Sequence, residues 1–131
     1  SAEPIDALLL TCLTAPLLEK HRVMYPPVHM ATNSALYAMP EAPGEYLLVE
    51  KGPLWRMLPR CNRLYLQGRP EPLTEDRIIR MRQLCEELER GSYRVIVFAE
   101  RLIRAPGNVD PLLVLKANQP SDAVLIGALS I

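Results

Sequence analysis

Aromatic side chains are scarce in this sequence of 131 residues, which has one Trp, one Phe and five Tyr. Surfaces that stack nucleic-acid bases usually combine several aromatic side chains with many cations. The formal net charge is zero, because fifteen basic residues balance fifteen acidic ones. No overall field therefore attracts nucleic acid or an anionic membrane, and we expect neither as a partner.

Cysteine and histidine are also few, and their spacing excludes the common metal sites. Three Cys form no CxxC pair, and the two His are not spaced as helical or knuckle ligands. An odd number of Cys favours free thiols in a reducing compartment. We expect no metal and no cofactor. These residues are Cys12, Cys61, Cys85, His21 and His29.

Long hydrophobic runs are missing as well. The apolar run at residues 7–18 is too short to span a bilayer and is interrupted by Pro16. Two acids and no base precede it, whereas a secretory signal begins with positive charge. We expect a single globular domain, residues 1–131, in the cytoplasm.

Prolines punctuate the first half of the chain, so its elements are expected to be short. Apolar spacing predicts a helix over residues 4–21, with a kink or a restart at Pro16. Three strands and one helical turn are then predicted between prolines. The strands are 28–32, 36–39 and 45–50, and the turn is 54–58.

The clearest unit covers residues 63–99. A strand at 63–67 is followed by a helix that Thr74 caps and Gly91 ends in a left-handed conformation, and then by a strand at 93–99. Strand, helix and strand in this order predict a right-handed crossover with the two strands parallel.

The remaining chain predicts a hairpin of two strands, 112–116 and 123–128. The fold class expected is α/β, with α+β as the alternative: a mixed sheet of five or six strands, the β-α-β crossover at 63–99 and two main helices. The apolar end of the chain is expected either in the core or as an edge strand against another chain.

Residues 52–70 hold the densest group of cations beside an aromatic ring. Tryptophan next to arginine is typical of the residues that carry most of the energy in protein interfaces. A GC-rich genome, as in many bacteria, would also favour Arg over Lys without any selection for function. From this group we expect a contact surface in an arginine-rich loop: Trp55, Arg56, Arg60 and Arg63.

An anion site is the alternative for the same arginines. Arginine pairs well with carboxylate and phosphate, and His29 would add a group for acid-base chemistry. Arg60 and Arg63 would lower the pKa of the Cys61 thiol and activate it as a nucleophile. An inert or semi-exposed thiol and a structural histidine remain the simpler interpretation. No glycine-rich phosphate motif supports this site.

The sequence therefore predicts a non-catalytic interaction or accessory domain, which docks on a protein partner or self-associates as a homo-oligomer. The alternative is a binding domain, or a small enzyme, for an anionic small molecule held by arginines and His29.

Overall fold

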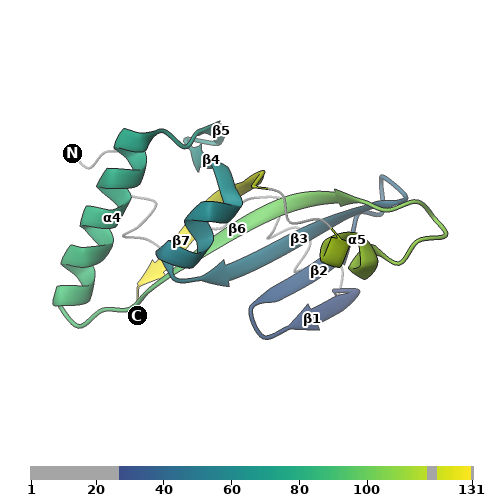
Figure 1. Ribbon diagram of the computed structural model, residues 1–131, viewed down its shortest axis with the longest axis horizontal. Coiled ribbons are helices and arrows are strands. Elements are labelled where there is room, and N and C mark those ends of the chain that lie inside the picture. The colour runs from purple at the N-terminus through teal and green to yellow at the C-terminus, as the bar shows by residue number, and fades with distance from the viewer. Residues whose placement is uncertain (1–26, 118–120, 131) are drawn as a thin grey trace.

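The computed structural model describes residues 27–117 and 121–130, and it is built on one mixed sheet of seven strands. The sheet order is β1-β2-β3-β6-β7-β4-β5, and the long strands β3 and β6 run side by side through its centre (Figure 1). The strands are β1 His29–Ala31, β2 Ser34–Ala38, β3 Glu45–Gly52, β4 Cys61–Leu66, β5 Arg69–Pro72, β6 Val95–Arg104 and β7 Ala123–Ser130.

The sheet corrects the expected fold class. It has seven strands instead of five or six, and sheet dominates the described chain, so an α/β domain with two main helices is wrong. The described helices are α3 Leu54–Met57, the 3-10 turn η1 Leu58–Arg60, α4 Glu75–Arg90 and α5 Pro111–Ala117. The helix predicted at 4–21 lies outside the described residues.

The crossover through α4 starts from β5 and not from the predicted strand at 63–67, because β5 and β6 run parallel in the sheet with β4 and β7 between them. β4 pairs in parallel with β7, and β6 pairs antiparallel with β7, so β4 and β6 run antiparallel and the prediction that strands 63–67 and 93–99 are parallel is wrong. The physical reason is a two-residue turn at Gln67 and Gly68, whose φ angles of 53° and 79° fit a tight hairpin. The chain thus turns back as β5 before it enters α4.

The end of the chain forms a central strand and not an edge. β7 lies between β6 and β4, so it is not available to pair with another chain as an edge strand. The edges of the sheet are β1 and β5. Pro70 and Pro72 in β5 cannot donate backbone hydrogen bonds, which discourages further pairing at that edge.

The hairpin predicted for residues 112–128 is also wrong, because its first half is the helix α5. The Asp110 side chain accepts a hydrogen bond from the Leu112 amide at 3.0 Å, and Pro111 occupies the first helical position. A side-chain acceptor followed by proline is a helix start, because proline has no amide hydrogen to leave unpaired there.

α4 begins where its sequence predicts. The Thr74 hydroxyl accepts from the Arg77 amide at 3.4 Å, and Glu75 and Asp76 place negative charge in the first turn. Its end differs in detail, because Gly91 has a φ of −83° and the left-handed residue is Ser92, with a φ of 69°. Within the described ranges, no helix is long and apolar enough to cross a membrane.

Helices cover one face of the sheet at two separate places. α3, η1 and α4 pack on a large core cluster that includes Leu64, Met81 and Leu125. α5 packs near the other end of the same face, against Leu48 and Ile103. The space between these two packed regions is a cavity over the sheet.

Candidate functional site

Three hollows that share lining residues surround the C-terminal half of β3. The largest, about 560 Å³, is called here the arginine cavity because it is lined by Arg56, Arg60 and Arg101. The second, about 150 Å³, is called the lysine cleft after Lys51. A third hollow of about 210 Å³, called here the connecting groove, adjoins both, because Ser34 and Glu50 line all three.

Strand alternation in β3 sends neighbouring side chains to opposite faces of the sheet. Leu48 packs with the α5 cluster and Val49 with a separate cluster, which identifies the two faces. Glu50 therefore lies on the face of the arginine cavity, while Lys51 lies on the face of the lysine cleft. β3 thus lines two hollows that contain basic side chains, one on each face of the sheet.

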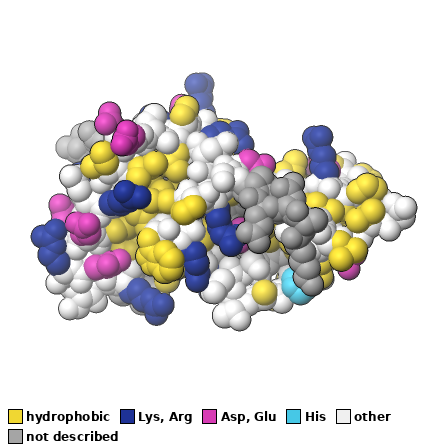
Figure 2. Space-filling model, viewed as in Figure 1, with side chains coloured by type: hydrophobic (Ala, Val, Ile, Leu, Met, Phe, Trp, Pro, Cys, Tyr) yellow, Lys and Arg dark blue, Asp and Glu magenta, His cyan; other side chains and the backbone are white. Residues whose placement is uncertain are grey.

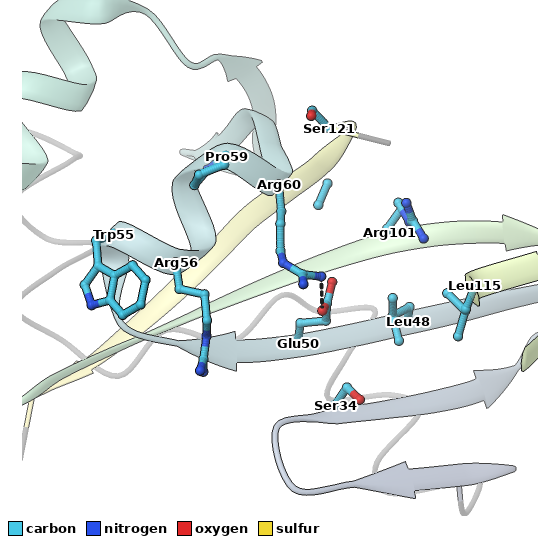
Figure 3. Close-up of a pocket in the computed structure, with 11 residues that line it drawn as sticks. Ser34, Leu48, Glu50, Trp55, Arg56, Pro59, Arg60, Arg101, Leu115 and Ser121 are labelled. Carbon is cyan, nitrogen blue, oxygen red and sulfur yellow. Dashed lines mark hydrogen bonds and ion pairs between the residues drawn. The ribbon is translucent and has the colours of Figure 1, made fainter. Parts of the chain in front are cut away.

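Short helical segments carry several of the residues that line the arginine cavity. Pro53 precedes α3, and the cluster beneath it buries Leu54 and Met57, so the intervening side chains of Trp55 and Arg56 point outward. In Figure 3, Arg56 and Arg60 extend from α3 and η1 toward β3. The space-filling view shows Lys and Arg side chains set among hydrophobic ones on this side of the molecule (Figure 2).

The three guanidinium groups of the cavity are paired to different extents. Arg60 Nη1 lies 2.6 Å from Glu50 Oε2, which is a short ion pair and hydrogen bond (Figure 3). Arg101 Nη1 lies 3.7 Å from Asp122 Oδ1, beyond hydrogen-bond distance. Arg56 Nη2 donates to the Lys51 carbonyl oxygen at 3.3 Å. The cavity therefore has guanidinium donors available to a ligand.

The lysine cleft combines one cation with aromatic side chains. Lys51 lies directly opposite Phe98 in the β3–β6 register, so both side chains project from the same face. Tyr37 and Met30 also line the cleft. Among the described residues, Lys51 has no acidic partner.

A buried acid lies on the same face as Lys51. Glu100 is opposite Val49 in the sheet and is 7% exposed, and within residues 27–117 and 121–130 its Oε2 has no hydrogen-bond partner. Burial raises the pKa of this carboxyl from 4.5 to about 7, because removal from water disfavours the charged form. The group is therefore partly protonated at neutral pH.

Three of the four residues predicted for the contact surface come together. Trp55, Arg56 and Arg60 all line the arginine cavity. Arg63 does not, because it lies further along on β4, where it pairs with Pro72 and, after a register shift, with Val124. His29 is exposed on the edge strand β1 and lines none of the three hollows.

The environment of Cys61 disfavours the thiolate form that an activated thiol needs. Its pKa is raised to about 12, mainly by burial and also by the charge of Glu50, while Arg60 acts in the opposite direction. The thiol is thus protonated at neutral pH, so the expected lowering by arginine is outweighed. Cys85 is also buried, and its pKa is raised to about 11, mainly by burial.

Two basic residues of the hollows were missed from the sequence. Arg101 comes from β6, and it reaches the arginine cavity because it lies directly opposite Leu48. Lys51 follows the predicted strand 45–50, and it belongs to β3, which continues to Gly52. The strand alternation of residues 45–52 was the signal that could have placed Lys51 and Glu50 on opposite faces.

The residues that the structure describes contain no group of three His, Cys, Asp or Glu side chains that could hold a metal ion. The polar and aromatic groups that line the hollows are guanidinium, ammonium, hydroxyl, carboxylate and aromatic side chains. Of these, the cationic, hydroxyl and aromatic groups bind and orient anions through charge-assisted hydrogen bonds and stacking.

Comparison with known protein families matches residues 30–131 to a family described as P-type ATPase, cytoplasmic domain N. A comparison with curated proteins finds no match. The family description names one domain of a larger enzyme, which agrees with the expected accessory domain. The match includes the whole described sheet except His29, and with it all three hollows. The chain belongs to the family of P-type ATPase cytoplasmic N domains.

Proposed function

We propose that this domain is a non-catalytic, cytoplasm-facing part of a P-type ATPase and that it binds the adenine nucleotide on which such an enzyme acts. The observation that carries the proposal is the lysine cleft, where a cation without an acidic partner among the described residues lies beside aromatic side chains. An adenine nucleotide has the matching chemistry, because it combines an aromatic base with a polyanion.

The dimensions of the cleft favour an arrangement in which only part of the nucleotide is enclosed. Its volume of about 150 Å³ lies well below the several hundred Å³ typical of pockets that enclose a whole ligand. The base would lie against Tyr37 and Phe98, and the phosphates would extend past Lys51 into the connecting groove. That groove adds the Arg56 guanidinium to the positive charge.

The test is ATP binding by the Lys51→Ala variant, measured by isothermal titration calorimetry. Loss of one charge-assisted contact costs roughly 1.5–3 kcal/mol, so affinity should fall about tenfold or more. Arg69→Ala is the matched control, because it also removes one exposed cation but lies on the edge strand β5.

An equal loss of affinity in both variants would mean that ATP senses only the general charge of the domain, and the proposal would fail. Absence of saturable ATP binding in the unmodified protein would refute it directly. Circular dichroism of each variant establishes that the sheet is intact.

A second candidate function is docking on a protein partner or self-association. The Trp55 side chain is 74% exposed and stands beside Arg56, which is the composition of an interface contact. Under this function, the combined Trp55→Ala and Arg56→Ala variant should remain folded and lose association in analytical ultracentrifugation. If the variant and the unmodified protein have the same mass at every concentration, self-association through this surface is excluded.

A further inference from the structure

We propose that the arginine cavity is a second ligand site, which binds the dianion of a phosphate monoester carried on a flat apolar group. Most of it lies on the face of the sheet opposite the lysine cleft, so the nucleotide proposed above would reach only its Arg56 side through the groove and would leave Arg101 free for another ligand. Charge, burial and shape support this ligand class independently.

The charge of the lining matches a dianion. Three guanidinium groups and one carboxylate line the cavity, which leaves two net positive charges. Glu50 uses one nitrogen of Arg60, while a guanidinium group has five N–H donors. A phosphate monoester carries a charge between about −1.5 and −2 at neutral pH and offers three acceptor oxygens.

The burial of Arg101 indicates a site for an anion. Its side chain is only 12% exposed, while the carboxylate of Asp122, 3.7 Å away, is 54% exposed. A cation that is largely removed from water gains most from a close and well-oriented anion. A phosphate bound inside the cavity would provide contacts shorter than the one with Asp122.

The remaining walls fit an apolar, flat body. Leu48, Leu115 and Ala123 contribute apolar surface to the cavity, and Trp55 stands at one end of the group with its indole ring largely exposed (Figure 3). Aromatic rings stack on such a surface in an offset arrangement. The volume of about 560 Å³ is in the range of small-molecule pockets.

Trp55 provides the measurement, because it is the only tryptophan in the chain and it lines this cavity. Phenyl phosphate is titrated at pH 7.5 while the tryptophan emission is recorded, with inorganic phosphate as the second probe. We expect a saturable change with phenyl phosphate and about tenfold weaker binding of inorganic phosphate, which lacks the ring. Binding of phenyl phosphate should weaken below about pH 6, where the dianion takes up a proton.

Matched variants place the ligand in the cavity. Arg101→Met should weaken phenyl phosphate binding about tenfold or more, because it removes the buried guanidinium. Arg104→Met removes the same charge from the same strand, but at an exposed position paired with Glu45 at 3.1 Å, and it should change binding less than twofold. Arg101→Lys keeps the charge without the planar fork and should give an intermediate loss, which also covers a failure of Arg101→Met to fold.

The Lys51→Ala variant separates this proposal from the nucleotide site. It should retain the response of Trp55 to phenyl phosphate, whether or not it binds ATP. Equal losses in Arg101→Met and Arg104→Met, or a linear, unsaturated response in the unmodified protein, would overturn the second site and leave the nucleotide proposal standing.

Discussion

The two faces of β3 differ in how they use adjacent charged residues. Glu50 on one face is held by Arg60 in a short ion pair inside a large cavity. Lys51 on the other face has no acidic partner among the described residues and lies beside Phe98 in a small cleft. One strand therefore supplies an acid in an ion pair to one hollow and, to the other, a base without an acidic partner in the described part of the chain.

The elements that cover each face, and not the strand itself, decide which type of hollow forms. On the first face, α3 with η1 and α5 stand apart and leave a deep space between them. On the second face, the buried cluster consists of Tyr37, Leu47, Val49 and Ile126, all of them from strands. A change in one covering element should therefore affect one hollow and spare the other.

The largest effect is expected from Met57→Ala. Met57 is 1% exposed and anchors α3, so its truncation should reduce the free energy of unfolding by about 3 kcal/mol, measured by urea denaturation. It should also weaken the response of Trp55 to phenyl phosphate, because α3 carries Trp55.

Ile126→Ala is the matched variant on the other face, where Ile126 is 2% exposed. It should cost a similar free energy and leave the Trp55 response unchanged. Equal loss of that response in both variants would contradict the separation of the two faces.

A smaller effect is expected from Glu100→Gln. The pKa of Glu100 is higher in the folded protein, at about 7, than its ordinary 4.5, so the folded state holds the proton more tightly. The free energy of unfolding should therefore fall as pH rises from about 4.5 to 7, by on the order of 2 kcal/mol, and stay lowered above pH 7. Glu100→Gln should remove this fall, as measured by urea unfolding at pH 5 and pH 8.

Glu87→Gln, at an exposed position on α4, serves as the control and should follow the unmodified protein at both pH values. Parallel behaviour of Glu100→Gln and the unmodified protein would show that the carboxyl does not titrate in this range.

The smallest effect is expected from Gly52→Ala. A methyl group at this position would collide with the Arg56 guanidinium, whose Nε would lie 2.8 Å from the new carbon. Because that group is the end of a flexible side chain, it should move aside, and stability should change by less than about 0.5 kcal/mol. Phenyl phosphate affinity should fall two- to threefold, whereas a loss as large as that in Arg101→Met would contradict this prediction.

Local signals in the sequence predicted several elements well. The predicted strand at 45–50 lies between a Pro-Gly turn and a Gly-Pro turn. In the structure it begins at the same residue and continues to Gly52. The helix after Thr74 follows from its cap and its first-turn acids. These elements are set by neighbours in the sequence, which is why a single sequence predicts them.

Sequence reasoning failed where the neighbours were distant or the apolar run was short. The apolar run at 112–116 fits a strand or a helix equally well. The Asp110-Pro111 pair before it is a helix start, and this signal favoured the helix. β5 was missed because it contains two prolines, which an edge strand tolerates. Arg101 entered the site only through its pairing with Leu48, more than fifty residues away, which no local pattern reveals.

The position of β7 has a consequence for how the domain forms during synthesis. The last described strand is the one that joins β1, β2, β3 and β6 to the β4–β5 hairpin. In a growing chain, the first four of these strands can pair as soon as β6 leaves the ribosome. The β4–β5 hairpin has no strand to join until β7 follows. Ribosome-bound chains that stop before residue 123 should thus expose two unpaired strand edges, and they are the species on which chaperones would act.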